Sequence, residues 1–184
     1  KRRTMIEEHV VVETPEGDMS TFIVRPQSDD LLPTILFLMD APGKREELHD
    51  MARRIAAAGY YVMLPNLYYR DVPSFTVHRE DPVSARYMAQ LMANLSNSMV
   101  ARDAAVLLNY AAKEVAADEN SVGVTGYCMS GPFALWVAAE YPEKVRATAS
   151  IHGVKLALDT EDSPHKRAED IAAEVLVMAA EFDD

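Results

Sequence analysis

The feature that most constrains the fold is an apolar strand, an amphipathic helix and a second apolar strand in direct succession. Thr34–Met39 is almost wholly apolar, as strands buried on both faces of a sheet are. Residues 46–58 place apolar side chains at helical spacing and are followed by Gly59, a residue type common just after a helix. Residues 60–64 form the second apolar run. This succession predicts a βαβ crossover and therefore a parallel sheet.

The rest of the chain extends this pattern on both sides. Residues 9–13 and 20–25 are β-rich runs separated by a turn that holds Pro15 and Gly17, which predicts an antiparallel hairpin. An irregular segment over 66–82 is long enough to suggest a functional loop. We find no repeat or linker, so residues 1–184 are interpreted as one domain. The remaining predicted elements are helices over 84–95, 98–115 and 131–140 and strands over 120–125, 145–151 and 175–180.

Charge and cysteine content exclude several classes of function. The 184 residues include 29 acidic and 18 basic side chains, a formal net charge of −11, which disfavours nucleic-acid and anionic membrane partners. The single cysteine excludes an internal disulfide and a multi-thiolate zinc site, so we expect a reducing compartment, the cytoplasm. No metal-binding or nucleotide-binding motif is present, and we expect neither a metal nor another cofactor.

The chemistry-bearing segment is residues 122–133, where a β-run, a tight turn and an apolar helix follow one another. Gly126, Cys128 and Ser130 fit the pattern small-x-nucleophile-x-small of a strained strand-to-helix turn. A cysteine there lies at a helix N-terminus, which favours the thiolate, and the Met129 N–H faces a developing oxyanion. The alternatives are a buried packing cysteine, since free cysteines are often buried, or Ser130 as the nucleophile.

These residues resemble the dienelactone hydrolase family, whose cysteine-dependent members carry Gly-x-Cys-x-Gly-Gly at this turn. Here the turn reads Gly126-Tyr127-Cys128-Met129-Ser130-Gly131. The resemblance covers most of the chain through further segments in the same order, over residues 50–56, 59–62, 64–70, 150–153 and 180–183. It implies an α/β-hydrolase fold, a mostly parallel sheet flanked by helices with an N-terminal antiparallel hairpin.

The resemblance also assigns roles, residue by residue. Cys128 is the nucleophile, and Asp183 is the acid that orients a histidine, with Asp184 as the competing assignment. The backbone N–H groups of Ala41 and Met129 stabilise the oxyanion. Asp40 occupies the position of a family glutamate that takes up the thiol proton, and it is one methylene shorter.

The catalytic histidine has no obvious counterpart. The chain contains His9, His49, His78, His152 and His165, and all five precede Asp183, whereas the family order is nucleophile, acid, histidine. We therefore expect the histidine beyond Asp184 and interpret the chain as lacking the family's C-terminal segment.

The resulting hypothesis is an enzyme that hydrolyses an ester or lactone through a thioester intermediate on Cys128. Its partner is a small-molecule substrate, for which Arg70, Arg86 and His152 are candidate binding residues. The alternatives are a catalytically inactive hydrolase-fold binding module and a redox-sensing thiol protein. The sequence leaves the substrate and the oligomeric state open.

Overall fold

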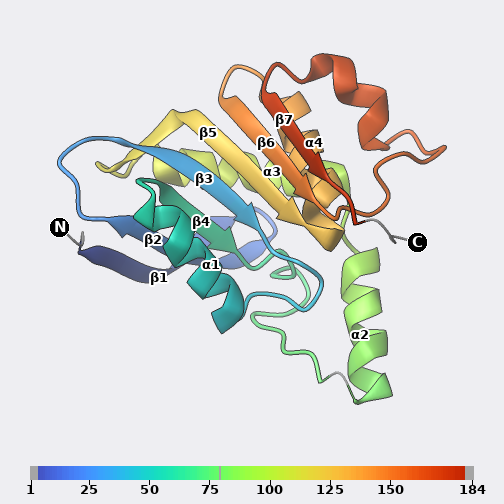
Figure 1. Cartoon of the computed structure of the whole chain (residues 1–184). Helices are drawn as coiled ribbons and strands as arrows, with labels where there is room; N and C mark the ends of the chain where they lie inside the picture. The colour runs from blue at the N-terminus through green and yellow to red at the C-terminus, as the bar shows by residue number, and fades with distance from the viewer. Residues whose placement is uncertain (1–3, 79, 181–184) are drawn as a thin grey trace.

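The computed structural model of the protein describes residues 4–78 and 80–180. Within these ranges seven strands form one sheet in the order β1-β2-β4-β3-β5-β6-β7 (Figure 1). β2 runs antiparallel to β1 and β4, and the other neighbours are parallel, which confirms the predicted hairpin and parallel core. The strands are β1 (Met5–Thr14), β2 (Gly17–Pro26), β3 (Leu32–Leu38), β4 (Tyr61–Pro65), β5 (Ala117–Tyr127), β6 (Val145–Ile151) and β7 (Glu174–Met178).

Helices cover both faces of the sheet. α1 packs in front of it against β2 and β4, whereas α3 and α4 lie behind it against β5 and its neighbours (Figure 1). α4 is apolar nearly throughout because it is buried between α3 and the sheet. The α-helices are α1 (Glu46–Ala57), α2 (Pro82–Ala93), α3 (Asn97–Ala111) and α4 (Gly131–Glu140), and two 3₁₀ segments are η1 (Cys128–Ser130) and η2 (Pro164–Asp170). None of the helices in the described ranges has the length and apolar character needed to cross a bilayer.

Local signals set the helix ends. The Asp81 carboxylate accepts hydrogen bonds from the Val83 and Ser84 N–H groups, and Pro82 occupies the first turn of α2, where a missing N–H costs nothing. Ser96 caps α3 by accepting from the Met99 N–H. α1 ends before Gly59, whose φ of +108° confirms the predicted position after the helix.

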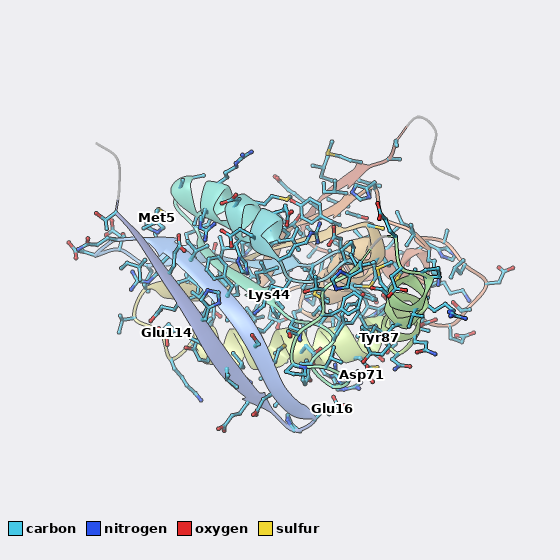
Figure 2. The ribbon with its side chains drawn as sticks, turned by 90° about the horizontal axis from the view of Figure 1, so that it is seen from below. Met5, Glu16, Lys44, Asp71, Tyr87 and Glu114 are labelled. Atoms are coloured by element: carbon cyan, nitrogen blue, oxygen red, sulfur yellow. The ribbon has the colours of Figure 1, made fainter. Side chains whose placement is uncertain are left out.

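The N-terminal hairpin is a long two-stranded ribbon, with Met5 near one end and Glu16 at its turn (Figure 2). The Thr14 hydroxyl donates to the Gly17 carbonyl at 2.8 Å and accepts from the Glu16 N–H at 3.0 Å, which closes the turn. Both strands are longer than predicted, because the β pairing continues through polar residues that sequence periodicity leaves out.

The carboxyl ends of the parallel strands meet at one edge of the sheet. Leu38 of β3 pairs with Gly126 of β5, and Tyr127 pairs with Ile151 of β6. The residues that follow these strands therefore lie along one edge, the usual location for sites on open α/β sheets.

The last strand differs most from its neighbours. Residues 175–178 of β7 are 50–53% exposed although all four are apolar. Among the described residues β7 pairs only with β6, so it forms the edge of the sheet. The 3₁₀ segment η2 was not predicted, since residues 164–170 carry little apolar periodicity.

Candidate active site

Cys128 lies in the strained strand-to-helix turn that the sequence predicts. It follows β5 directly, has a φ of +52° and begins the 3₁₀ turn that leads into α4. A non-glycine residue in this region carries backbone strain, and such strain clusters at functional sites. A Cβ on Gly126 would lie 2.0 Å from the Ser130 carbonyl oxygen, so only glycine fits there. The geometry matches a nucleophile elbow, with a partly exposed thiol.

The rival nucleophile, Ser130, faces inward. Its side chain is fully buried, and its hydroxyl donates a hydrogen bond to the carbonyl of Met39, the residue that follows β3. This hydrogen bond ties the turn to the neighbouring strand. The position of Ser130 is that of a supporting residue, which leaves Cys128 as the more accessible nucleophile.

Glycines also let the turn approach the loop after β6. A Cβ on Gly131 would lie 2.4 Å from the Gly153 Cα, so the two backbones touch. Next to this contact, the Val154 N–H donates to the Cys128 carbonyl at 3.3 Å. The loop after β6 therefore supports the nucleophile turn from the side.

Ala41 and Met129, the two expected oxyanion donors, are linked by Tyr68. The buried Tyr68 hydroxyl donates to the Ala41 carbonyl at 2.8 Å and lies 3.3 Å from the Met129 sulfur. The Ala41 N–H itself makes no hydrogen bond to any described residue. Burial raises the pKa of Tyr68, and negative charge on Asp40 and on the Cys128 sulfur raises it further. Tyr68 thus contacts both expected oxyanion residues.

Asp40 is held by a neighbouring guanidinium. Its two oxygens accept hydrogen bonds from Arg45 at 2.6 and 3.0 Å, and the hydrogen bond to Asp40 raises the pKa of Arg45. Asp40 lies two residues beyond Leu38, level with Cys128 along the strand register. Any transfer of the thiol proton to Asp40 would therefore compete with the Arg45 pair.

Arg70 is occupied elsewhere. Its guanidinium binds the buried Asp103 at 2.7 and 3.0 Å and Glu16, at the hairpin turn, at 2.6 Å. Figure 2 shows Asp71, the next residue, on the same side of the molecule as Glu16. Burial alone would lower the pKa of Arg70, but the hydrogen bonds to Glu16 and Asp103 raise it. These ion pairs give Arg70 a structural role, so we do not propose it as a substrate-binding residue.

The other substrate candidates lie on different elements. Arg86 is exposed on α2. His152 directly follows β6 with a φ of +39°, and its N–H donates to the Met178 carbonyl at 2.6 Å. Because Ile151 pairs with Tyr127, His152 flanks Cys128 at the carboxyl edge of the sheet.

The other histidines lie on different parts of the molecule. His9 and His49 stack on Phe22 between the hairpin and α1, and the His165 ring hydrogen-bonds the Ser163 hydroxyl in the segment that leads into η2. The remaining His78 is exposed in the loop before α2. Asp183 and Asp184 lie outside the described residues. Within the described ranges no three His, Cys, Asp or Glu side chains cluster as a metal site would require.

The contact of Tyr68 with Ala41 could not be predicted from the sequence. Tyr68 lies in the irregular segment 66–82, and nothing in the sequence shows that its hydroxyl reaches Ala41, 27 residues away. The Ala41 N–H, which has no hydrogen-bond partner among the described residues, and the strained Cys128 form an arrangement suited to attack on a carbonyl carbon.

Comparisons with known proteins point in one direction. The model of the dienelactone hydrolase family matches residues 19–184. A Salmonella typhi relative provisionally named carboxymethylenebutenolidase is 27% identical over 167 residues, 86% of this chain and 56% of the relative. The carboxymethylenebutenolidase of Rhodococcus opacus is 28% identical over 138 residues, 73% of this chain and 50% of the relative. The chain thus spans about half the length of these relatives.

Solved structures share the fold. A Klebsiella pneumoniae protein provisionally named dienelactone hydrolase matches with a TM-score of 0.80 and 24% identity, over 95% of this chain and 72% of the other. The dienelactone hydrolase of Anabaena variabilis matches with a TM-score of 0.64 and 18% identity, over 97% of this chain and 88% of the other. At these identities the likeness supports the α/β-hydrolase fold.

Proposed function

The chain belongs to the dienelactone hydrolase family, and we propose on that basis that it cleaves an ester or lactone bond with Cys128 as the nucleophile. The observation that carries the proposal is the Cys128 turn, where a strained, partly exposed thiol follows β5 at the carboxyl edge of the sheet. Relatives carry the name carboxymethylenebutenolidase, which agrees with hydrolysis of a lactone.

In the proposed first step the histidine expected beyond Asp184 takes the proton of the Cys128 thiol, and the resulting thiolate attacks the carbonyl carbon of the substrate. The carbonyl π electrons move onto oxygen, and the Ala41 and Met129 N–H groups stabilise that oxyanion. When the carbonyl re-forms, the alkoxide leaves with a proton from a histidine, and the acyl group remains on sulfur as a thioester.

In the second step water completes the reaction. The histidine takes a proton from the water as it attacks the thioester, and collapse of the second oxyanion expels the Cys128 thiolate and releases the acid. Asp183 orients this histidine, as the family resemblance implies. For a lactone the alcohol and the acid stay in one molecule, so a single ring-opened product is formed.

Tyr68 supports the proposed oxyanion site. Its hydroxyl donates to the Ala41 carbonyl, which belongs to the peptide group after the one that carries the Ala41 N–H, and it contacts the Met129 side chain. Preorganised donors avoid reorganisation at the moment of reaction, so restraining residue Ala41 from its carbonyl side contributes to rate. A reducing compartment, the cytoplasm, would suit this unpaired thiol.

Replacement of Cys128 tests the proposal. In the full-length protein, which includes the segment expected to carry the histidine, we expect Cys128→Ala to lower the hydrolysis of p-nitrophenyl butyrate by about 10³-fold or more while the circular dichroism spectrum stays unchanged. Ser130→Ala is the matched control, because it removes a nearby hydroxyl that is buried and hydrogen-bonded.

Chemical modification of Cys128 provides a second test of the proposed nucleophile. Cys128 is the only cysteine, so iodoacetamide can alkylate no other thiol. Stoichiometric alkylation is expected to abolish hydrolysis, and substrate is expected to slow the alkylation. Full activity in Cys128→Ala, or after complete alkylation, would refute the mechanism. Loss of activity in Ser130→Ala alone would assign the nucleophile to Ser130.

A further inference from the structure

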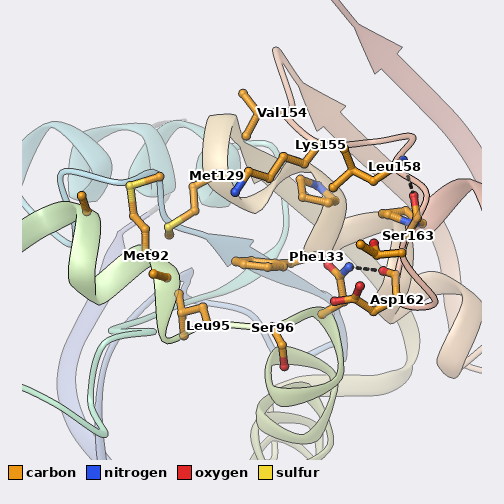
Figure 3. Close-up of a pocket in the computed structure, with 16 residues that line it drawn as sticks. Met92, Leu95, Ser96, Met129, Phe133, Val154, Lys155, Leu158, Asp162 and Ser163 are labelled. Atoms are coloured by element: carbon orange, nitrogen blue, oxygen red, sulfur yellow. Dashed lines mark hydrogen bonds between the residues drawn. The ribbon is translucent and has the colours of Figure 1, made fainter.

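A pocket of about 430 Å³ lies beside the Cys128 turn (Figure 3). We call it the α2–α4 pocket, because its walls come from the end of α2, the segment leading into α3, the start of α4 and the loop after β6. The apolar side chains that line it are those of Met92, Leu95, Met129, Phe133, Val154 and Leu158. Its volume lies within the range of small-molecule sites.

The pocket adjoins the proposed nucleophile through two of its walls. Met129, which lines it, is the residue after Cys128. Val154 lines it as well, and its N–H donates to the Cys128 carbonyl at 3.3 Å. The pocket therefore begins at the residue that follows Cys128 and at a residue that hydrogen-bonds the Cys128 backbone.

Several apolar side chains in the pocket are open to solvent. Val154 is 36% exposed and Leu158 is 41% exposed, whereas Phe133 is buried at 7%. Covering such surface with an apolar ligand removes it from water, which is favourable in proportion to the area buried. The exposed apolar side chains thus favour an apolar occupant.

Charged groups in the pocket occupy its two ends. The Lys155 side chain runs toward Met129, and Asp162 lies at the opposite end (Figure 3). The long methylene stem of a lysine can itself serve as apolar wall while its ammonium stays in water. The middle of the pocket, around Phe133, is left to the apolar groups.

The walls are held in place by hydrogen bonds away from the apolar surface. The Asn97 amide donates to the Asp162 carbonyl at 2.5 Å, which joins α3 to the loop after β6. The Ser163 hydroxyl accepts from the Leu158 N–H at 2.8 Å, which fixes that loop (Figure 3). A pocket fixed in this way loses little conformational entropy when a ligand binds.

We propose that the substrate carries an apolar, uncharged acyl chain of several carbons, and that the α2–α4 pocket binds this chain. The proposal rests on the proposed function for the location of the scissile bond. It deepens that function by naming the substrate class as esters or lactones with an alkyl-substituted acyl group.

Chain-length dependence of hydrolysis tests the proposal. Across p-nitrophenyl acetate, butyrate, hexanoate and octanoate, we expect kcat/KM to rise about fourfold per added methylene until the pocket is full. Values of kcat/KM that do not depend on acyl length, or that fall from acetate onward, would overturn the proposal.

Two variants on α2 test whether the dependence of kcat/KM on acyl length arises in this pocket. Ala93 lines the pocket and is exposed, so Ala93→Trp fills space there without disturbing the core. We expect it to remove the preference for octanoate over acetate, because the indole ring occupies space that a long acyl chain would enter. Ala85→Trp is the matched control, since Ala85 is exposed on the same helix outside the pocket. An equal effect of both variants would contradict the assignment.

A binding measurement separates this proposal from the proposed function. With the methionine methyl groups labelled with ¹³C, titration with 1-octanol is expected to shift the NMR signals of Met92 and Met129. The signals of Met19 and Met63, which are fully buried in the core, are expected to stay in place. Shifts without any hydrolysis would leave the pocket assignment standing and refute the hydrolase. Hydrolysis that ignores chain length, with no shift at Met92 or Met129, would refute the pocket alone.

Discussion

Neighbouring residues of the loop that follows β4 contribute to two clusters, a structural cluster and the candidate site, and the two clusters use their polar groups differently. In the structural cluster, Arg70 binds Asp103 and Glu16, and Tyr69 donates to Asp103 at 2.8 Å. In the candidate site, Cys128 is strained and the Ala41 N–H makes no hydrogen bond to any described residue. The first cluster satisfies its charges internally, whereas the second leaves groups available to a ligand.

The two clusters differ in whether a charged side chain stabilises the fold or remains available to a substrate. Arg70 and Tyr68 are two residues apart in the segment after β4, and of the two the sequence suggests Arg70 as a substrate-binding residue. Their side chains go to different clusters, because Asp103 of α3 attracts the guanidinium whereas the Tyr68 hydroxyl turns to Ala41. Charge on a loop is therefore a weaker indicator of a site here than strain at a strand end.

The largest effect on stability is expected from the structural cluster. Asp103→Ala leaves a largely buried guanidinium with Glu16 as its remaining ion-pair partner, and we expect the free energy of unfolding to fall by about 3–5 kcal/mol. Urea denaturation measures this change. Asp159→Ala, at an exposed position, is the control and is expected to change stability by less than about 0.5 kcal/mol. If Asp103→Ala were as mild as its control, the cluster would not have the structural role assigned to it.

The next largest effect is expected at the Cys128 turn. Gly126→Ala places a Cβ 2.0 Å from the Ser130 carbonyl, so backbone must move. We expect a loss of about 1–3 kcal/mol in stability and of about 100-fold in kcat/KM, since the nucleophile is displaced. Gly123→Ala, in the same strand, meets only the flexible end of the Ile35 side chain at 2.6 Å and is expected to keep most activity. Equal activity in the two variants would argue against a constrained turn.

Much of this fold follows from local sequence signals. α4 over 131–140 and β6 over 145–151 have the predicted bounds, and Gly131 and Pro132 mark the start of α4. Gly126 of the elbow was also predictable, since a Cβ there would meet Ser130, four positions along the chain. These features depend on neighbours in the sequence.

What could not be predicted depends on distant partners. Arg70 meets residues 54 and 33 positions away, and no local pattern encodes those ion pairs. Asp40 and Arg45 are only five residues apart, yet the sequence does not indicate that the Asp40 carboxylate pairs with this guanidinium. The α2–α4 pocket combines four segments, so its shape emerges only from the tertiary packing.

A smaller effect on activity is expected at Tyr68, which contacts both Ala41 and Met129. Tyr68→Phe keeps the ring, which packs edge-on to Phe75, and removes the hydroxyl that holds Ala41. Because one hydrogen bond contributes about 1 kcal/mol, we expect kcat to fall about fivefold while KM changes less than twofold. Steady-state kinetics measure the separate effects on kcat and KM. Tyr87→Phe is the control, because Tyr87 is exposed to solvent. A change confined to KM would assign Tyr68 to substrate binding.

The smallest effect is expected at the exposed rim of the structural cluster. The hydrogen bond from Arg70 lowers the pKa of Glu16, so ionised Glu16 stabilises the fold above its unfolded pKa and loses this effect as the pH falls through the folded pKa. We expect Glu16→Gln to cost less than about 1 kcal/mol at pH 7. The difference from the unmodified protein should shrink as the pH is lowered from about 5 toward 3. A difference that grows in acid would reverse the assigned sign.

Trapping the acyl-enzyme tests the central claim most directly. The protein is mixed with p-nitrophenyl hexanoate, quenched in acid within the first turnovers, and examined by intact-protein and fragment mass spectrometry. The account predicts one hexanoyl group per chain, placed by the fragments on Cys128 and absent from Cys128→Ala. A hexanoyl group on Ser130, or rapid hydrolysis with no covalent acyl group at any time, would contradict it.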